Sequence, residues 1–477
     1  MNVLLISLDT TRAQSLSCYG CSKLTSPHLD ALANEGAVFT ECFSTHIPTH
    51  PGHTCMFTGM DVMRHQIVCQ GGAKELDPAI KTLPEILSNQ GYFTAAADSL
   101  GRWFSRGFQV YERYSWQKDG IVAPRKAEAV NKVALKLLEE CAAQDKPWFL
   151  FVHYWDAHTP YIVPPPFDRM FYDGDETDPN NHSMDPVYAC EPFRDYFLQW
   201  MFTPDPEEPG NPEKWRRWTD RGFVNALYHS AIAYMDVALC ALFYKLEELK
   251  LDEKTLVVIT ADHGEELDEH GLWYDHHGLY DTNTRIPLIL RCPGTIPAGL
   301  RLGGLVRLFD LPPTILDFLG KGDLISKYGM EGHSLVPLIC GVNQAGTCDE
   351  LYMTEDTWMR RRAIRTRRWL FIQEAVEGGT PEVYGRPSKE LYDLVNDPGQ
   401  LRNLAFDLPE VVAELEAHLM KWRDRRMRET GLPDPIEEQG ITLRQITVTG
   451  PKASLSHKER PVELEDKSGR FAGYDRR

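Results

Sequence analysis

Short continuous runs of apolar residues alternate along the chain with stretches in which apolar residues recur at helical spacing. The continuous runs predict buried strands over Asn2–Leu8, Val38–Phe43, Tyr92–Ala97, Trp148–Tyr154, Thr255–Thr260 and Ile286–Arg291. The helical spacing predicts helices over Ser26–Gly36, Lys81–Gly91, Ala127–Cys141, Phe223–Lys250 and Phe309–Leu319. Because strand and helix alternate, we expect an α/β fold with a large, mostly parallel sheet sandwiched by helices.

A different pattern begins after Gly341–Gly346, where this alternation stops. Leu351–Gln373 and Lys389–Leu394 predict a smaller antiparallel sheet, and Leu408–Met427 predicts a charged amphipathic helix packed on it. We therefore expect a large domain over residues 1–345 and a smaller C-terminal α+β subdomain over 346–430.

Two segments do not follow either pattern. Residues 164–222 are rich in Pro, Asp and Trp and predict an irregular insertion, which in a compact domain is usually a lid or a partner surface. Residues 431–477 are polar and carry little core material. This tail predicts either an arm that binds a neighbouring subunit of a homo-oligomer or a segment without fixed structure.

Composition and charge narrow the class of partner. The chain has 51 basic and 69 acidic residues, a net charge of −18, which argues against nucleic acid or an anionic membrane as a partner. No apolar run is long enough to span a bilayer, and Met1–Asp9 lacks the basic start of a signal peptide. The eleven cysteines are scattered, so we expect reduced thiols and a cytoplasmic protein. A small anionic substrate would need a metal ion or a few local cations.

Carboxylates and imidazoles follow several of the predicted strands. The carboxyl ends of parallel strands meet at one edge of a sheet, where open α/β folds bind their ligands. Each residue has an ordinary alternative, since an Asp at a strand end is often a turn or cap residue and a lone His is usually structural. The residues at these ends are Asp9, Asp156, His158, Asp262, His263, His276 and His277.

Thr49 lies in the stretch Ile47–Gly59, which reads I-P-T-H-P-G-H-T-C-M-F-T-G and predicts one short helix with Thr49 at its start. The alternative is an ordinary Thr N-cap. A hydroxyl that shares a site with Asp9, Asp262 and His263 suits a nucleophile activated by a metal ion, because the cation lowers the pKa of the alcohol.

Several motifs together resemble the alkaline phosphatase superfamily, and in particular its sulfatase family, over about residues 2–430. The opening L-L-I-S-L-D-T-T-R is followed by C-Y-G, T-H-P-G-H-T-C-M-F-T-G, W-D-A-H-T-P-Y, T-A-D-H-G-E-E-L-D-E-H-G and E-L-Y-D-L-V-N-D-P. Each motif alone is weak, but their order and separation fit the family. The resemblance implies an ester hydrolase with an alkaline phosphatase-like fold.

The chain departs from the sulfatase pattern at the residues that decide the chemistry. Thr49 stands where similar sulfatases carry the Cys or Ser that is oxidised to formylglycine, and the methyl group on its Cβ prevents oxidation to an aldehyde. His53 replaces an Arg and Thr10 replaces the second N-terminal Asp. His263 replaces an Asn, and His276 replaces a substrate-binding Lys.

These departures resemble the phosphate-ester members, such as nucleotide pyrophosphatases/phosphodiesterases, in which a Thr nucleophile lies between two divalent ions. The resemblance implies one cation held by Asp9, Thr49, Asp262 and His263. A second cation would take Asp156, His158, and His276 or His277, although His158 also matches a sulfatase substrate-binding His and the His276-His277 pair could be a hydrogen-bonded loop pair. We therefore expect one or two divalent ions per chain. Mixed carboxylate and imidazole ligands favour zinc or manganese over calcium or magnesium.

The expected reaction is hydrolysis of a phosphoric ester, preferably a phosphodiester or a phosphonate monoester, through a phospho-threonine intermediate at Thr49. His158 or His276 would protonate the leaving group, and His53 and Arg12 are candidate substrate-binding residues, with Arg12 better explained as a salt-bridging scaffold residue. Sulfate-ester hydrolysis by unmodified Thr49 and phosphoryl transfer to an alcohol are the alternatives. In a third alternative, the protein is a non-catalytic member that only binds a ligand, but the intact Thr49 nucleophile argues against this.

Overall fold

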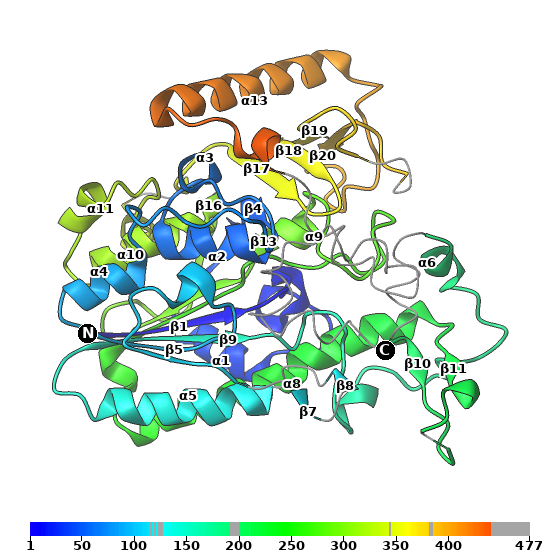
Figure 1. Cartoon of the computed structure of the whole chain (residues 1–477), viewed down its shortest axis with the longest axis horizontal. Helices are drawn as coiled ribbons and strands as arrows, with labels where there is room; N and C mark the ends of the chain where they lie inside the picture. The colour runs from blue at the N-terminus through cyan, green and yellow to red at the C-terminus, as the bar shows by residue number, and fades with distance from the viewer. Residues whose placement is uncertain are drawn as a thin grey trace.

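The large sheet forms the centre of the molecule in the computed structural model, which describes residues 1–114, 117–118, 121–122, 127–190, 200–208, 210–342, 345–380 and 385–439. Its strand order is β15-β2-β14-β12-β1-β9-β5-β6 (Figure 1). In that order the strands are Leu300–Leu302, Ala37–Phe39, Leu288–Arg291, Thr255–Thr260, Asn2–Leu8, Trp148–Tyr154, Phe93–Ala97 and Val110–Glu112. All neighbours are parallel except β14, which is antiparallel to both β12 and β2, so the expected mostly parallel α/β sheet is confirmed.

Strands β1, β9 and β12 lie side by side at the middle of the sheet, and their bounds equal those expected from the sequence. Nearly every residue in them is buried, because helices cover both faces. In Figure 1, α2, α4 and α10 lie above the sheet, whereas α5 and α8 lie below it. The helices are α1 (Pro27–Asn34), α2 (Thr49–Thr58), α3 (Val62–His65), α4 (Leu83–Asn89), α5 (Ala127–Ala142), α6 (Asp185–Ala189), α8 (Arg221–Glu248), α9 (Asp281–Thr284), α10 (Leu311–Phe318), α11 (Asp323–Lys327), α12 (Val336–Ile339), α13 (Pro409–Thr430) and α14 (Pro435–Glu438).

Helix α8 is long and apolar enough, by length and composition alone, to cross a membrane. Of the most apolar 18-residue window of this helix, 72% is buried inside the molecule. The helix packs there against α5 and α1. This burial explains its apolar composition as that of a core helix.

Two predicted strands are interrupted in the structure. Val38–Phe43 divides into β2 and β3 (Cys42–Phe43), and Ile286–Arg291 divides into β13 (Arg285–Ile286) and β14. Pro287 separates β13 from β14, since proline has no N–H to donate to a ladder. The detached pieces form a three-stranded sheet with β16 (Val306–Arg307).

The C-terminal subdomain contains a five-stranded sheet with the order β20-β19-β18-β17-β4. Its strands are Lys389–Asp393, Trp369–Glu374, Arg360–Arg365, Leu351–Asp356 and His46–Ile47. The last of these, β4, comes from the N-terminal region and pairs in parallel with β17, whereas the other neighbours are antiparallel. Because β4 ends two residues before Thr49, the subdomain fixes the position at which α2 begins.

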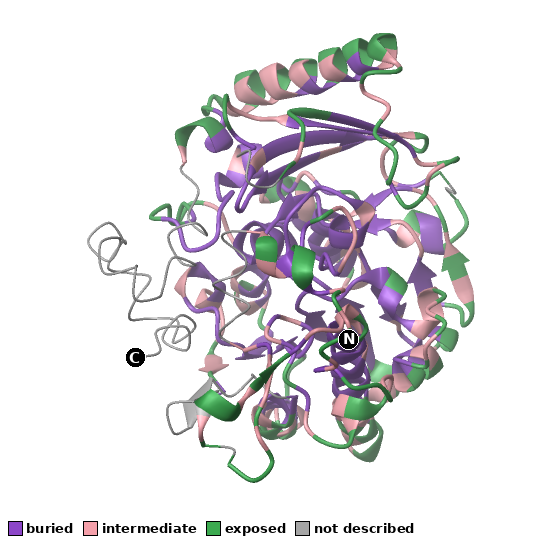
Figure 2. Cartoon of the chain, turned by 90° about the vertical axis from the view of Figure 1, so that its right-hand side faces the viewer, coloured by how far each residue is buried: buried purple, intermediate pink, exposed green. Residues whose placement is uncertain are grey.

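Helix α13 covers this sheet, and Figure 2 shows a buried sheet beneath a helix whose outer face is exposed. Residues 431–439 also belong to the subdomain, since Ile436 of α14 is fully buried and Asp434 forms an ion pair with Arg362. The predicted oligomerisation role of the tail therefore concerns residues 440–477, which lie outside the described residues. Before the start of α8, the described part of the insertion contains only short elements: α6, β10 (Phe202–Thr203), β11 (Arg216–Arg217) and two 3-10 helices, Phe167–Arg169 and Pro212–Lys214. A further short pair, β7 (Gln117–Lys118) and β8 (Ile121–Val122), precedes α5.

We expect Glu390→Gln to destabilise the fold by about 3 kcal/mol, because it leaves a buried guanidinium without its charged partner. Glu390 forms an ion pair with Arg361, and both side chains are fully buried. Burial opposes ionisation, but Arg361 and Arg386 lower the pKa of Glu390 to about 2. Its folded-state pKa lies below the unfolded value, so this stabilisation is present above about pH 4.5 and is lost as pH falls towards 2. Chemical denaturation at pH 7 and pH 3 checks this: the stability difference between wild type and the variant should shrink at pH 3, and an unchanged difference would contradict it.

Candidate active site

Thr49 is the first residue of α2, with Pro48 at the N-cap position, so its side chain is free of the capping role considered from the sequence. Its Oγ1 lies 3.2 Å from Nε2 of His263. The Nδ1–H of His263 donates to the carbonyl oxygen of Gly264 at 2.8 Å, which leaves Nε2 as the acceptor for the Thr49 hydroxyl. Burial lowers the pKa of His263, so the imidazole is neutral at neutral pH and keeps this lone pair.

Asp9, Asp262 and His263 form one buried group whose ligand-type atoms all lie within 4.8 Å of one another. Asp9 directly follows β1 and Asp262 lies just beyond β12, and because these parallel strands are neighbours, both carboxylates reach the same edge of the sheet. Oδ1 of Asp9 and Oδ2 of Asp262 accept no hydrogen bond from any described residue. Two buried carboxylate oxygens without donors, beside a neutral imidazole and a hydroxyl, fit a divalent cation.

The helix that carries Thr49 packs closely on Asp262. A Cβ added at Gly52 would lie 2.7 Å from the carbonyl oxygen of Asp262, so only glycine allows this approach. The G of T-H-P-G-H therefore has a packing role that the sequence alone did not reveal.

A buried chain of polar groups supports Asp9 from behind. Nε2 of His153 lies 3.0 Å from Oδ2 of Asp9, and its Nδ1 lies 2.8 Å from Oδ1 of Asp98. The other oxygen of Asp98, Oδ2, accepts a hydrogen bond from the Tyr111 hydroxyl. Although burial acts in the opposite direction, the two carboxylates raise the pKa of His153 to about 9. His153 was missed in the sequence, because it sits inside the apolar strand Trp148–Tyr154 and carried no motif signal.

We expect His153→Gln to weaken divalent metal binding about 10- to 100-fold, since partners that orient a metal ligand contribute about this much. Metal titration of chelator-treated protein measures the change, and Ser99→Ala, a buried side chain near the same sheet edge, serves as a matched control. Unchanged metal affinity in His153→Gln would show that Asp9 is positioned without it.

His53 lies one turn after Thr49 and is fully buried. Its Nδ1–H donates to the carbonyl oxygen of Thr49 at 3.0 Å, and its Nε2 lies 3.1 Å from Oγ of Ser7. Both ring nitrogens are thus engaged by protein atoms, so in this structure His53 orients the start of α2, and its predicted substrate contact stays a prediction.

Arg12 is also engaged by the protein. Its guanidinium forms an ion pair with Glu269 at 2.7 Å and is only 3% exposed. Its backbone N–H donates to the Tyr228 hydroxyl at 3.0 Å. This arrangement fits the salt-bridging scaffold role rather than a substrate clamp.

The second cation set that the sequence predicted is not among the clustered groups of ligand atoms in the described residues. Oδ1 of Asp156 accepts a hydrogen bond from the backbone N–H of Ala127 at 3.0 Å and so caps the start of α5. His158 is partly exposed and its ring centroid lies 5.0 Å from that of His276. Nε2 of His277 lies 3.0 Å from Oδ2 of Asp275. Among the described residues, the second group with clustered ligand atoms is instead Glu265, Asp275 and His276.

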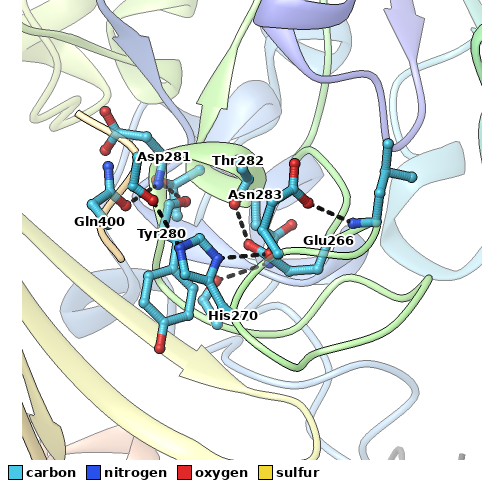
Figure 3. Close-up of polar contacts among 12 residues, drawn as sticks. Glu266, His270, Tyr280, Asp281, Thr282, Asn283 and Gln400 are labelled. Atoms are coloured by element: carbon cyan, nitrogen blue, oxygen red, sulfur yellow. Dashed lines mark hydrogen bonds and ion pairs between the residues drawn. The ribbon is translucent and has the colours of Figure 1, made fainter. Parts of the chain in front are cut away.

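Both groups depend on the loop between β12 and α9, which Figure 3 shows held by polar contacts at its base. Glu266 contacts His270 at 2.9 Å and also Thr282. The backbone N–H of Asp281 donates to Oε1 of Gln400 at 2.9 Å, which ties the loop to the C-terminal subdomain. Gly264 allows the sharp return, since a Cβ there would lie 2.3 Å from the carbonyl oxygen of Thr282.

This combination of a mostly parallel sheet with a hydroxyl, carboxylates and imidazoles at its carboxyl edge defines a hydrolase of the alkaline phosphatase-like class. The sulfatase family profile matches residues 1–321, and the profile of the N-sulphoglucosamine sulphohydrolase C-terminal region matches residues 268–425. The chain belongs to the sulfatase family and is a hydrolase that acts on ester bonds.

Among curated relatives, it is 23% identical to an N-acetylglucosamine-6-O-sulfatase of Bacteroides thetaiotaomicron, over 93% of this chain and 89% of the relative. It is 25% identical to a choline-sulfatase of Rhizobium meliloti, over 89% of this chain and 86% of the relative. Among solved structures, the phosphonate monoester hydrolase of Agrobacterium radiobacter matches with a TM-score of 0.67 at 22% identity, covering 89% of this chain and 96% of the other. These likenesses confirm the fold predicted from the sequence motifs.

Proposed function

We propose that this chain hydrolyses phosphoric esters, with phosphodiesters or phosphonate monoesters preferred, and that Thr49 is the nucleophile. The observation that carries the proposal is the Thr49 hydroxyl, 3.2 Å from Nε2 of His263, which itself belongs to the cluster formed with Asp9 and Asp262. The hydroxyl side chain of threonine cannot yield the aldehyde that formylglycine sulfatases use, so the nucleophile is the alcohol itself.

The donor set of Asp9, Thr49, Asp262 and His263 would hold one divalent cation, and its mixture of carboxylate and imidazole favours zinc or manganese. When bound there, the cation would lower the pKa of the Thr49 hydroxyl and offset negative charge on the phosphoryl oxygens. The partial positive charge at the start of α2 adds to the attraction for an anion.

In the first step, Oγ1 of Thr49 gives its proton to solvent water and attacks phosphorus, and the bond from phosphorus to the leaving oxygen breaks. The leaving oxygen takes a proton from an imidazole. His158 suits this role better than His276, since His158 is partly exposed and His276 is 3% exposed, and a departing alcohol must reach solvent. In the second step, water attacks the phospho-threonine, the imidazole that lost its proton in the first step accepts a proton from that water, and Oγ1 of Thr49 leaves and takes a proton from solvent.

The sulfatase relatives support one alternative, in which the same Thr49 attacks sulfur in a sulfuric ester. Metal analysis of the purified protein, with turnover of p-nitrophenyl phosphate, bis-p-nitrophenyl phosphate, p-nitrophenyl phenylphosphonate and p-nitrophenyl sulfate, separates the two. We expect a bound divalent metal and a Thr49-dependent preference for the phosphorus esters. A Thr49-dependent preference for sulfate would overturn the proposal in favour of the alternative. Transfer of the phosphoryl group to an added alcohol would identify a transferase, and inactivity on all four esters would favour a ligand-binding relative.

A further inference from the structure

Glu265, Asp275 and His276 form a second buried group of ligand-type side chains, and no sequence motif predicted Glu265 or Asp275 for this role. Their ligand atoms all lie within 4.8 Å of one another. Glu265 is fully buried, and His276 and Asp275 are 3% and 7% exposed. The group therefore concentrates two carboxylates and an imidazole in a place that water scarcely reaches.

Glu265 is the independent sign that this group has a ligand. Neither of its carboxylate oxygens has a hydrogen-bond partner among the described residues. The Tyr161 hydroxyl is close enough to interact with this carboxylate, but a neutral hydroxyl does not offset its negative charge. A buried carboxylate without donors is costly to keep in its charged form, and a cation would offset that cost.

The distances in the group suit ligands around one ion. Nδ1 of His276 lies 2.9 Å from Oδ1 of Asp275 and 3.9 Å from Oε1 of Glu265, and it makes no hydrogen bond with any residue that the structure describes. Metal–ligand bonds of about 2.0–2.2 Å place neighbouring ligand atoms about 3–4 Å apart. Carboxylate and imidazole donors again favour zinc or manganese.

The surroundings of Asp275 hold the ligands in place. Its Oδ2 lies 3.0 Å from Nε2 of His277 and 3.4 Å from Nε1 of Trp358, whereas its Oδ1 faces His276. The ring of His276 stacks on that of His263, with centroids 4.7 Å apart and planes inclined by 29°. The second group thus adjoins the group around Thr49 through two stacked imidazoles.

We propose that Glu265, Asp275 and His276 hold a second divalent cation next to the one assigned to Asp9, Thr49, Asp262 and His263. The inference rests on the proposed function, because the first site is part of that proposal. The second site assigns His276 to metal binding, so His158 remains as the proton donor to the leaving group.

The test is the number of metal ions that the full chain binds without substrate. Chelator-treated protein is titrated with Mn²⁺ alone, and separately with Zn²⁺ alone, and bound metal is measured by elemental analysis after removal of free ions. We expect two ions per chain for wild type and one for Glu265→Gln and for Asp275→Asn. The matched control is Asp268→Asn, a partly exposed carboxylate of the same loop that lies outside both groups, and it should keep two.

One ion per chain in wild type, or two retained in both Glu265→Gln and Asp275→Asn, would overturn the inference. Thermal unfolding of each variant shows whether it is folded. If a variant is not folded, the number of metal ions bound per wild-type chain tests the inference. The count involves no turnover, so its failure is distinct from failure of the proposed function. A chain with one ion and Thr49-dependent phosphoesterase activity contradicts only the second site, whereas two ions with activity that survives loss of Thr49 contradicts only the nucleophile.

Discussion

Replacement of Thr49 by valine should lower kcat on phosphoric esters by on the order of 10⁴-fold or more, because it removes the attacking oxygen and keeps the size of the side chain. Valine has a methyl group in place of Oγ1, so α2 and its packing on Asp262 should persist. Steady-state turnover of bis-p-nitrophenyl phosphate measures the effect, and thermal unfolding confirms that the variant is folded.

Thr49→Ser is the matched control for this change. It keeps the hydroxyl that lies next to His263 and loses only the methyl group, so we expect activity well above that of the valine variant. If Thr49→Val retained activity similar to wild type, Thr49 would not be the nucleophile and a water molecule would have to attack the ester directly.

Asp262→Asn should reduce kcat/KM by on the order of 10³-fold, which corresponds to about 4 kcal/mol. Asp262 lies within 4.8 Å of the ligand atoms of Asp9 and His263, and its Oδ2 accepts no hydrogen bond from the described part of the chain. An amide keeps the bond from the backbone N–H of Thr10, which is 3.2 Å from Oδ1, but removes the negative charge that would bind a cation.

The measurement is kcat/KM as a function of added Mn²⁺ or Zn²⁺, with Asp268→Asn as the control for loss of one carboxylate in the same region. Partial recovery of Asp262→Asn at high metal concentration would show that metal affinity is what was lost. Full activity of Asp262→Asn in the presence of a chelator would contradict a metal role for this residue.

The central strands could be predicted from the sequence because each is buried on both faces and therefore apolar along its whole length. This holds for β1, β9 and β12, whose bounds match the expectation. Strand β4 could not be predicted, since it has two residues and pairs with a strand about 300 residues further along the chain. Local patterning contains no information about such a distant partner.

The candidate site was predictable to the extent that its residues follow strand ends. Asp9, Asp262 and His263 do so, and the structure places them together. Asp156 also follows a strand, but its carboxylate caps α5, a contact that depends on where the helix begins in space. Glu265 and Asp275 meet only because the loop between β12 and α9 turns back and pairs Glu266 with Asp275, and the acidic sequence of the loop does not specify that pairing.

The most direct test of a Thr49-centred phosphoesterase is mass spectrometry of the enzyme quenched in acid during turnover of an equimolar mixture of bis-p-nitrophenyl phosphate and p-nitrophenyl sulfate. The account predicts that the peptide containing Thr49 carries a p-nitrophenyl phosphoryl group on Oγ1 and that Thr49→Val carries none. A sulfated Thr49 peptide, or turnover of the phosphodiester by Thr49→Val at the wild-type rate, would contradict it.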